Sequence, residues 1–133
     1  VDRIDCAVDI GVIVNPMLTD GQIHGGIVTG LGQALLEDAV YDEASGQLLA
    51  GSWMDYAMPR ADDVPAMNIR TIVIPSELNP LGIKGLGELP TNGAPAAVAN
   101  AVMDALRGHG VRQLPTPLTP ERVWRAIHAA GRA

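Results

Sequence analysis

The sequence contains no phenylalanine, and its aromatic residues are limited to two tryptophans and two tyrosines. Hydrophobic residues still make up 47% of the 133 residues, and 15 glycines accompany them. Small side chains let backbones approach closely, but each contributes less apolar area to a core than an aromatic ring does. We therefore expect one tightly packed domain over residues 1–133 that takes part of its stability from neighbouring protein.

Cysteine and positive charge are also scarce. The single cysteine, Cys6, excludes an internal disulfide and a cysteine cluster for zinc or iron–sulfur, and we expect it to be a small buried hydrophobe. The formal net charge is −6, and the 9 Lys and Arg residues are scattered, so the basic face that nucleic-acid binding needs is missing. Apolar runs fall far short of a bilayer span. Neither nucleic acid nor a membrane is an expected partner.

Hydrophobic patterning predicts an α+β fold, in which helices pack on one side of a small mixed sheet. Residues 3–14 and 68–75 are rich in β-branched side chains, which is typical of strands, and a hairpin is expected within residues 39–56. Helical spacing is found in residues 19–37 and 94–107, with a last helix that starts after Thr119.

Each predicted helix has a start signal. Thr19 or Asp20 is expected to cap the first helix, Pro95 suits the first turn of the second, and Thr119 with Pro120 begins the last. The first helix also contains several glycines, and each destabilises a helix interior by roughly 0.5–1 kcal/mol relative to alanine. Such a helix persists only if another element packs closely against its bare backbone.

Residues with catalytic chemistry are few. The histidines His24, His109 and His128 show no metal-ligand spacing, and no serine lies in a nucleophile elbow. One arrangement remains, the run from Lys84 to Glu88 (K-G-L-G-E) in a glycine-rich loop before a helix. Its glycines allow a large ligand to approach the backbone, and a desolvated Glu88 would act as a general base. Composition alone favours the alternative, an exposed turn glutamate.

Longer motifs favour a functional role for Glu88 over an exposed turn glutamate. The run N-P-L-G-I-K-G-L-G-E, the segment D-G-Q-I-H-G-G-I-V-T-G-L-G-Q-A-L and the closing P-T-P-L-T-P-E-R-V-W occur here in order. Together they resemble the C-terminal end of the large, molybdenum-binding subunit of the molybdenum hydroxylases, the family of xanthine dehydrogenase and aldehyde oxidoreductase. The resemblance covers almost the whole chain. It departs at His24, where relatives often have an acidic residue, and at Leu89, where many have a smaller one.

The resemblance implies roles for particular residues. Glu88 matches the glutamate that deprotonates the molybdenum-bound hydroxide, which then attacks an electron-poor carbon of an aldehyde or N-heterocycle. Lys84, Gly85, Leu86 and Gly87 match the stretch that wraps the pterin, and Gln22 matches a glutamine near it. The implied cofactor is molybdopterin with molybdenum, in the cytosine dinucleotide form. The pterin holds the metal, so no protein ligand to the metal is expected.

The resemblance also implies partners. These are the rest of the molybdenum-binding subunit, and iron–sulfur and flavin domains or subunits. Because this chain matches only part of a large subunit, we expect it to hold no cofactor and to be inactive when isolated. The alternative is a non-catalytic split or remnant module that binds and completes another subunit. A cytoplasmic location is expected, with the periplasm as the alternative.

Overall fold

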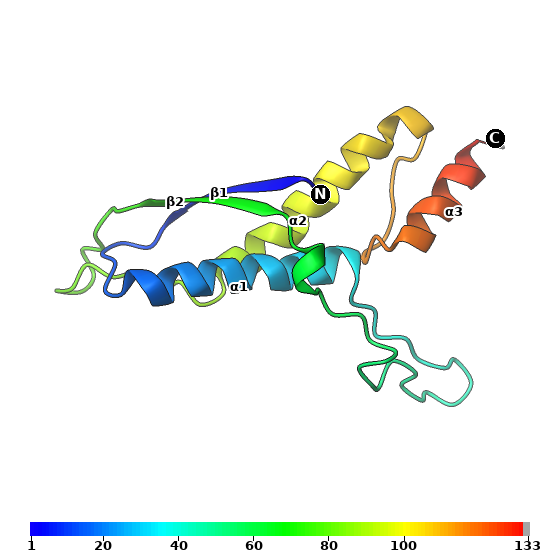
Figure 1. Ribbon diagram of the computed structural model, residues 1–133, viewed down its shortest axis with the longest axis horizontal. Coiled ribbons are helices and arrows are strands. Elements are labelled where there is room, and N and C mark those ends of the chain that lie inside the picture. The colour runs from blue at the N-terminus through cyan, green and yellow to red at the C-terminus, as the bar shows by residue number, and fades with distance from the viewer. Residues whose placement is uncertain (132–133) are drawn as a thin grey trace.

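A computed structural model describes residues 1–131 (Figure 1). These residues form, in chain order, β1 (Arg3–Asp9), α1 (Pro16–Leu35), η1 (Ala61–Asp63), β2 (Ala66–Ile72), α2 (Leu89–Leu106), η2 (Arg107–His109) and α3 (Pro120–Ala130). The strands lie over α1 and α2, and α3 lies apart from them beyond the end of α1 (Figure 1). None of the helices within residues 1–131 is long and apolar enough to cross a membrane.

β1 and β2 form a parallel pair, in register from Arg3 opposite Ala66 to Asp9 opposite Ile72. Side chains alternate along both strands, and one face packs against the helices. The resulting core joins β1 to α1 and α2, with Val8, Ile10, Ile23, Ile27 and Ala94 buried. The predicted α+β class is confirmed, and the strand pair of the described residues is parallel.

The start of α1 differs from the prediction. The helix begins at Pro16, and the side chain of Asn15 caps it by accepting a hydrogen bond from Leu18 N at 3.1 Å. Thr19 and Asp20 therefore lie inside the helix, and β1 ends at Asp9 instead of continuing to residue 14. An Asn-Pro pair serves equally well as a turn or as a cap with proline in the first turn, and the second use applies here.

Two glycines of α1, Gly26 and Gly30, lie where α2 crosses it. A Cβ atom on Gly30 would lie 2.7 Å from the Cβ of Ala94 and 2.8 Å from Cδ of Pro95. A Cβ on Gly26 would lie 3.0 Å from the Cβ of Pro90. The expectation that another element packs against the bare backbone is therefore confirmed, and that element is α2.

α2 begins earlier than predicted. It starts at Leu89, with Pro90 in its first turn, so Pro95 lies inside the helix and not at its start. A proline inside a helix removes one backbone hydrogen bond, which weakens the helix. The ring of Pro95 lies against Gly30 of α1, and this packing offsets the loss.

Residues 39–56 form little regular structure. The predicted hairpin is reduced to one antiparallel bridge between Tyr41 and Leu48, with a hydrogen bond from Asp42 N to Gln47 O of 2.8 Å. The segment extends away from the rest of the molecule (Figure 1), and Trp53 and Met54 are 79% and 93% exposed. Exposed apolar groups of this size agree with a unit that takes stability from neighbouring protein.

α3 is held at its N-terminal end. Thr119 caps the helix, as predicted, by accepting a hydrogen bond from Arg122 N at 3.3 Å. The guanidinium of Arg122 donates to Asp38 at 2.7 Å, and Leu118 N donates to the carbonyl of Ala34. These contacts tie α3 to the C-terminal end of α1.

Candidate functional site

The loop that carries Lys84 and Glu88 starts at a fixed point beside β1. Val12 N donates to the carbonyl of Gly82 at 3.0 Å, and Lys84 N donates to the carbonyl of Ile10 at 3.1 Å. Gly11 allows this approach because its φ of 65° suits glycine and because a Cβ atom there would collide with the Gly82 carbonyl. The start of the loop therefore pairs with the chain that leaves β1.

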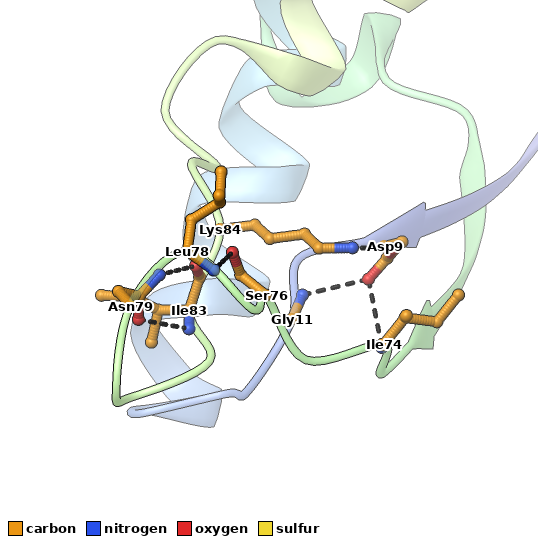
Figure 2. A network of polar contacts seen from close by, with 8 residues as sticks. All are labelled: Asp9, Gly11, Ile74, Ser76, Leu78, Asn79, Ile83 and Lys84. Carbon is orange, nitrogen blue, oxygen red and sulfur yellow. Dashed lines mark hydrogen bonds and ion pairs between the residues drawn. The ribbon is translucent and has the colours of Figure 1, made fainter.

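The side chain of Lys84 points back to β1. Its ammonium donates to Asp9 at 2.5 Å, and the other carboxylate oxygen of Asp9 accepts from Gly11 N at 3.1 Å and Ile74 N at 3.2 Å (Figure 2). The Lys84 ammonium above all, and then these backbone amides, hold the pKa of Asp9 below its ordinary value, although partial burial opposes them. Asp9 therefore joins the ends of both strands to the loop.

Further along, the loop is held to α1. Gln22 Nε2 donates to the carbonyl of Gly87 at 2.7 Å, although the two residues are 65 positions apart. Between these contacts, Leu86 packs against the buried core cluster. The structure thus brings together Gln22 and the run from Lys84 to Glu88, which the sequence placed far apart.

Around the hydrogen bond between Gln22 and Gly87, four glycines leave the backbone uncovered by other protein atoms. No protein atom lies within 4 Å of the place where a Cβ atom would stand on Gly21, Gly25, Gly85 or Gly87. Two of these glycines flank Gln22 on α1, and two flank Leu86 in the loop. The positions are open space, so a group from outside the chain can reach the backbone there.

Glu88 precedes α2 directly. Its carbonyl accepts a hydrogen bond from Asn92 N at 3.0 Å, but its side chain makes no capping bond and is exposed. The backbone of Glu88 is therefore fixed by the helix start and by the Gln22 contact at the preceding residue, while the carboxylate faces outward. Such a group is placed to act on something outside this chain.

The histidines take no part in this arrangement. Ring nitrogens of His24 and His128 contact the backbone carbonyls of Asp20 and Trp124 on their own helices. Within residues 1–131, no three His, Cys, Asp or Glu side chains are grouped so as to hold a metal ion.

Sequence reasoning missed Asp9. Two signals were available, because Lys84 is the only lysine in the chain and Asp9 lies two residues before Gly11, near the end of a predicted strand. A strand residue with an outward carboxylate is common, however, and only the paired backbone of residues 10–12 and 82–84 brings the two charges together.

Comparison with known proteins places this arrangement in a known class. The molybdopterin cofactor-binding domain matches residues 1–65. The chain is similar to the nicotine 6-hydroxylase large subunit of Paenarthrobacter nicotinovorans, with 45% identity over 95% of this chain and 15% of that protein. It is also similar to the xanthine dehydrogenase molybdenum-binding subunit of Escherichia coli O157:H7, with 38% identity over 98% of this chain and 17% of that protein.

A solved structure agrees in fold as well as in sequence. Quinoline 2-oxidoreductase from Pseudomonas putida 86 superposes with a TM-score of 0.87 and 48% identity, over 92% of this chain and 15% of that one. The chain belongs to the molybdenum-binding large subunits of the molybdenum hydroxylase family, as the resemblance of its motifs indicated. It spans about 15% of the length of the first of these curated relatives.

Proposed function

We propose that this chain supplies the catalytic base and part of the cofactor-binding surface of a molybdenum hydroxylase, with Glu88 as the base. The observation that carries the proposal is the hydrogen bond from Gln22 to the Gly87 carbonyl, 2.7 Å long. It joins two of the three segments on which the resemblance rests and leaves Glu88 exposed beside them. The substrate class is an aldehyde or an N-heterocycle, hydroxylated with oxygen derived from water.

The residues around Gln22 fit a large planar cofactor. Gly85 and Gly87 leave open space beside the backbone, and Gln22 keeps an amide oxygen for an outside donor. These residues, with the backbone of Lys84 and Leu86, would hold one edge of molybdopterin, in its cytosine dinucleotide form. When bound, the pterin supplies the molybdenum centre that accepts electrons from the substrate.

Within that site the chain's own residues hold and move a proton. The Glu88 carboxylate accepts the proton of the water-derived nucleophile, and Gln22 and Leu86 keep the loop in place. The remaining cofactor contacts come from the rest of the large subunit, and iron–sulfur and flavin partners carry the electrons away. The cytoplasmic location stays a prediction.

The test replaces Glu88 with Gln in the assembled enzyme and measures reduction of the enzyme by substrate. Glutamine keeps the shape of the side chain but cannot accept the proton, so the rate should fall by about 10²–10⁴-fold. Molybdenum content should stay at the wild-type level, because the change leaves the backbone around Gly87 intact.

Glu77→Gln is the matched control, because Glu77 is an exposed glutamate earlier in the same connection between β2 and α2. It should leave the rate unchanged. Near-wild-type reduction of the Glu88→Gln enzyme at full molybdenum content would remove Glu88 as the base and favour the alternative, a non-catalytic module.

A further inference from the structure

We propose that Asp9 and Lys84 act together as a positioning pair that sets where Glu88 stands, and this rests on the proposed role of Glu88 as the base. Neither side chain touches the reacting atoms in this account. Asp9 fixes the position of the Lys84 side chain, and Lys84 in turn fixes the conformation of the loop that carries Glu88.

Both strands and the loop meet at Asp9. One carboxylate oxygen accepts from Gly11 N and Ile74 N, which follow β1 and β2, and the other takes the ammonium of Lys84 (Figure 2). The carboxylate thus fixes the ends of both strands and the start of the loop relative to one another.

The Asp9–Lys84 pair is less exposed than another ion pair on the same strand. The side chains of Lys84 and Asp9 are 33% and 28% exposed, whereas those of Arg3 and Asp5 on the same strand are 67% and 50% exposed. An ion pair between well-exposed side chains contributes little, but a partly buried pair with further hydrogen bonds restricts the geometry of its surroundings. Lys84 is also the only lysine in the chain, so no other lysine of this chain can replace it.

Only three residues separate Lys84 from Glu88. The N–H of Lys84 is held by the carbonyl of Ile10, and its side chain by Asp9. Leu86 is held by the core and the Gly87 carbonyl by Gln22, while Gly85 and Gly87 have no neighbour within 4 Å of a Cβ position. Glycines without packed neighbours leave the backbone free to adopt several conformations. The contacts of Lys84, Leu86 and Gly87 therefore determine the conformation of the loop. Removing the contact between Asp9 and Lys84 shifts the loop, and a shift of about 1 Å at a reacting group can lower a rate by about 10²-fold.

The experiment uses the complete molybdenum-loaded enzyme with Asp9→Asn, Lys84→Met and both together. Each single variant should reduce the limiting rate of substrate oxidation about tenfold, with molybdenum content and KM near the wild-type values. The double variant should lose no more than either single one, because the two residues act as one unit. Asp9→Glu, which keeps the charge, should recover part of the rate. Asp5→Asn is the matched control and should keep the wild-type rate.

Two further readouts do not depend on activity. In Asp9→Asn, amide exchange over residues 84–88 and acylation of the Lys84 amine should both become faster than in the wild type, and in Asp5→Asn neither should change. A wild-type rate in Asp9→Asn at full molybdenum content would overturn the proposal, as would losses that multiply in the double variant. Failure of both single variants to accumulate with cofactor would also overturn it, because the pair would then be needed for folding itself.

The outcome for Glu88→Gln separates this proposal from the one on which it rests. If Glu88→Gln loses the rate and Asp9→Asn keeps it, only the positioning pair is wrong. If Glu88→Gln keeps the rate, the catalytic base is wrong, whatever happens at Asp9.

Discussion

Seven glycines of this chain form two groups, which differ in what lies beside their backbone. In the packed group, at Gly26, Gly30 and Gly32, a Cβ atom would lie between 2.7 and 3.0 Å from its nearest neighbour, on Pro90, Ala94 or Pro59. In the open group, at Gly21, Gly25, Gly85 and Gly87, nothing lies within 4 Å. The first group lets α2 and the segment at Pro59 approach α1, whereas the second leaves a surface without side chains.

This difference shows that one residue type has two physical roles along a single helix. Of the packed glycines of α1, Gly26 and Gly30 face α2 and Gly32 faces Pro59. The open ones lie beside Gln22, whose side chain holds the loop at Gly87. A helix built only for packing would gain stability from alanine at the open positions. Glycine at these positions agrees with the cofactor-binding surface proposed above, which needs the space.

The largest expected effect comes from filling a packed position. Gly30→Ala places a methyl group within 2.7 Å of the Cβ of Ala94 and 2.8 Å of Pro95 Cδ, and α1 and α2 must separate to admit it. Overpacking of this kind costs typically about 1–3 kcal/mol, so the free energy of unfolding of the chain should fall by that amount. Thermal or denaturant unfolding measures it. An unchanged stability would mean that α1 and α2 do not meet at Gly30.

The next effect concerns the open glycines of the loop. Gly85→Leu should leave the unfolding midpoint nearly unchanged, because the position is open and its φ is not positive. In the assembled enzyme the added side chain takes up space proposed for the pterin, so molybdenum content should fall about tenfold, or about 1.4 kcal/mol in binding. Elemental analysis measures this. Gly108→Leu, at an open glycine remote from Gln22, is the control, and equal losses in both variants would contradict the assignment.

A smaller effect of opposite sign is expected at an open position of α1. Gly25→Ala meets no atom within 4 Å and replaces glycine in a helix interior. The isolated chain should therefore gain about 0.5–1 kcal/mol of stability. The free energies of unfolding of Gly25→Ala and Gly30→Ala, measured under the same conditions, should change in opposite directions. A loss of stability at both positions would contradict the distinction between the two groups.

The smallest effect is the pH dependence of the contact at Asp9. The folded protein holds the pKa of Asp9 below its ordinary value, so the contact stabilises the fold fully above the unfolded pKa of about 4 and loses this effect as the pH falls through the lower folded value. The wild type should therefore be more stable than Asp9→Asn at neutral pH, and the difference should shrink below about pH 4. A difference that grows on acidification would contradict the assigned contact.

The sequence allowed the α+β class, the core helices and the cap at Thr119 to be predicted, because local periodicity and end signals determine them. It misplaced the start of α1, because Asn15-Pro16 serves as a cap and not as a turn. It also misplaced the start of α2, because Pro90 and Pro95 both suit a first turn. The predicted hairpin is reduced to one bridge, because the exposed segment around Tyr41 has no face that packs against the core.

The predicted site residues Gln22 and 84–88 meet in the structure, and the roles assigned to them remain predictions. What the sequence could not provide is the partner of Lys84. That contact depends on the closure of a long connection, and local pattern carries no information about which strand end a distant loop will meet.

The parallel pairing of β1 with β2 has a consequence for the order in which the chain can fold during synthesis. β1 and α1 emerge first, but their apolar faces are completed only by β2 and α2, and Asp9 meets Lys84 across 75 positions. Contacts between such distant residues form slowly, because a long loop must close before any of them is gained. The apolar faces of β1 and α1 therefore stay exposed until β2 and α2 have been synthesised. Exposed apolar surface of this kind is the condition in which nascent proteins depend on chaperones.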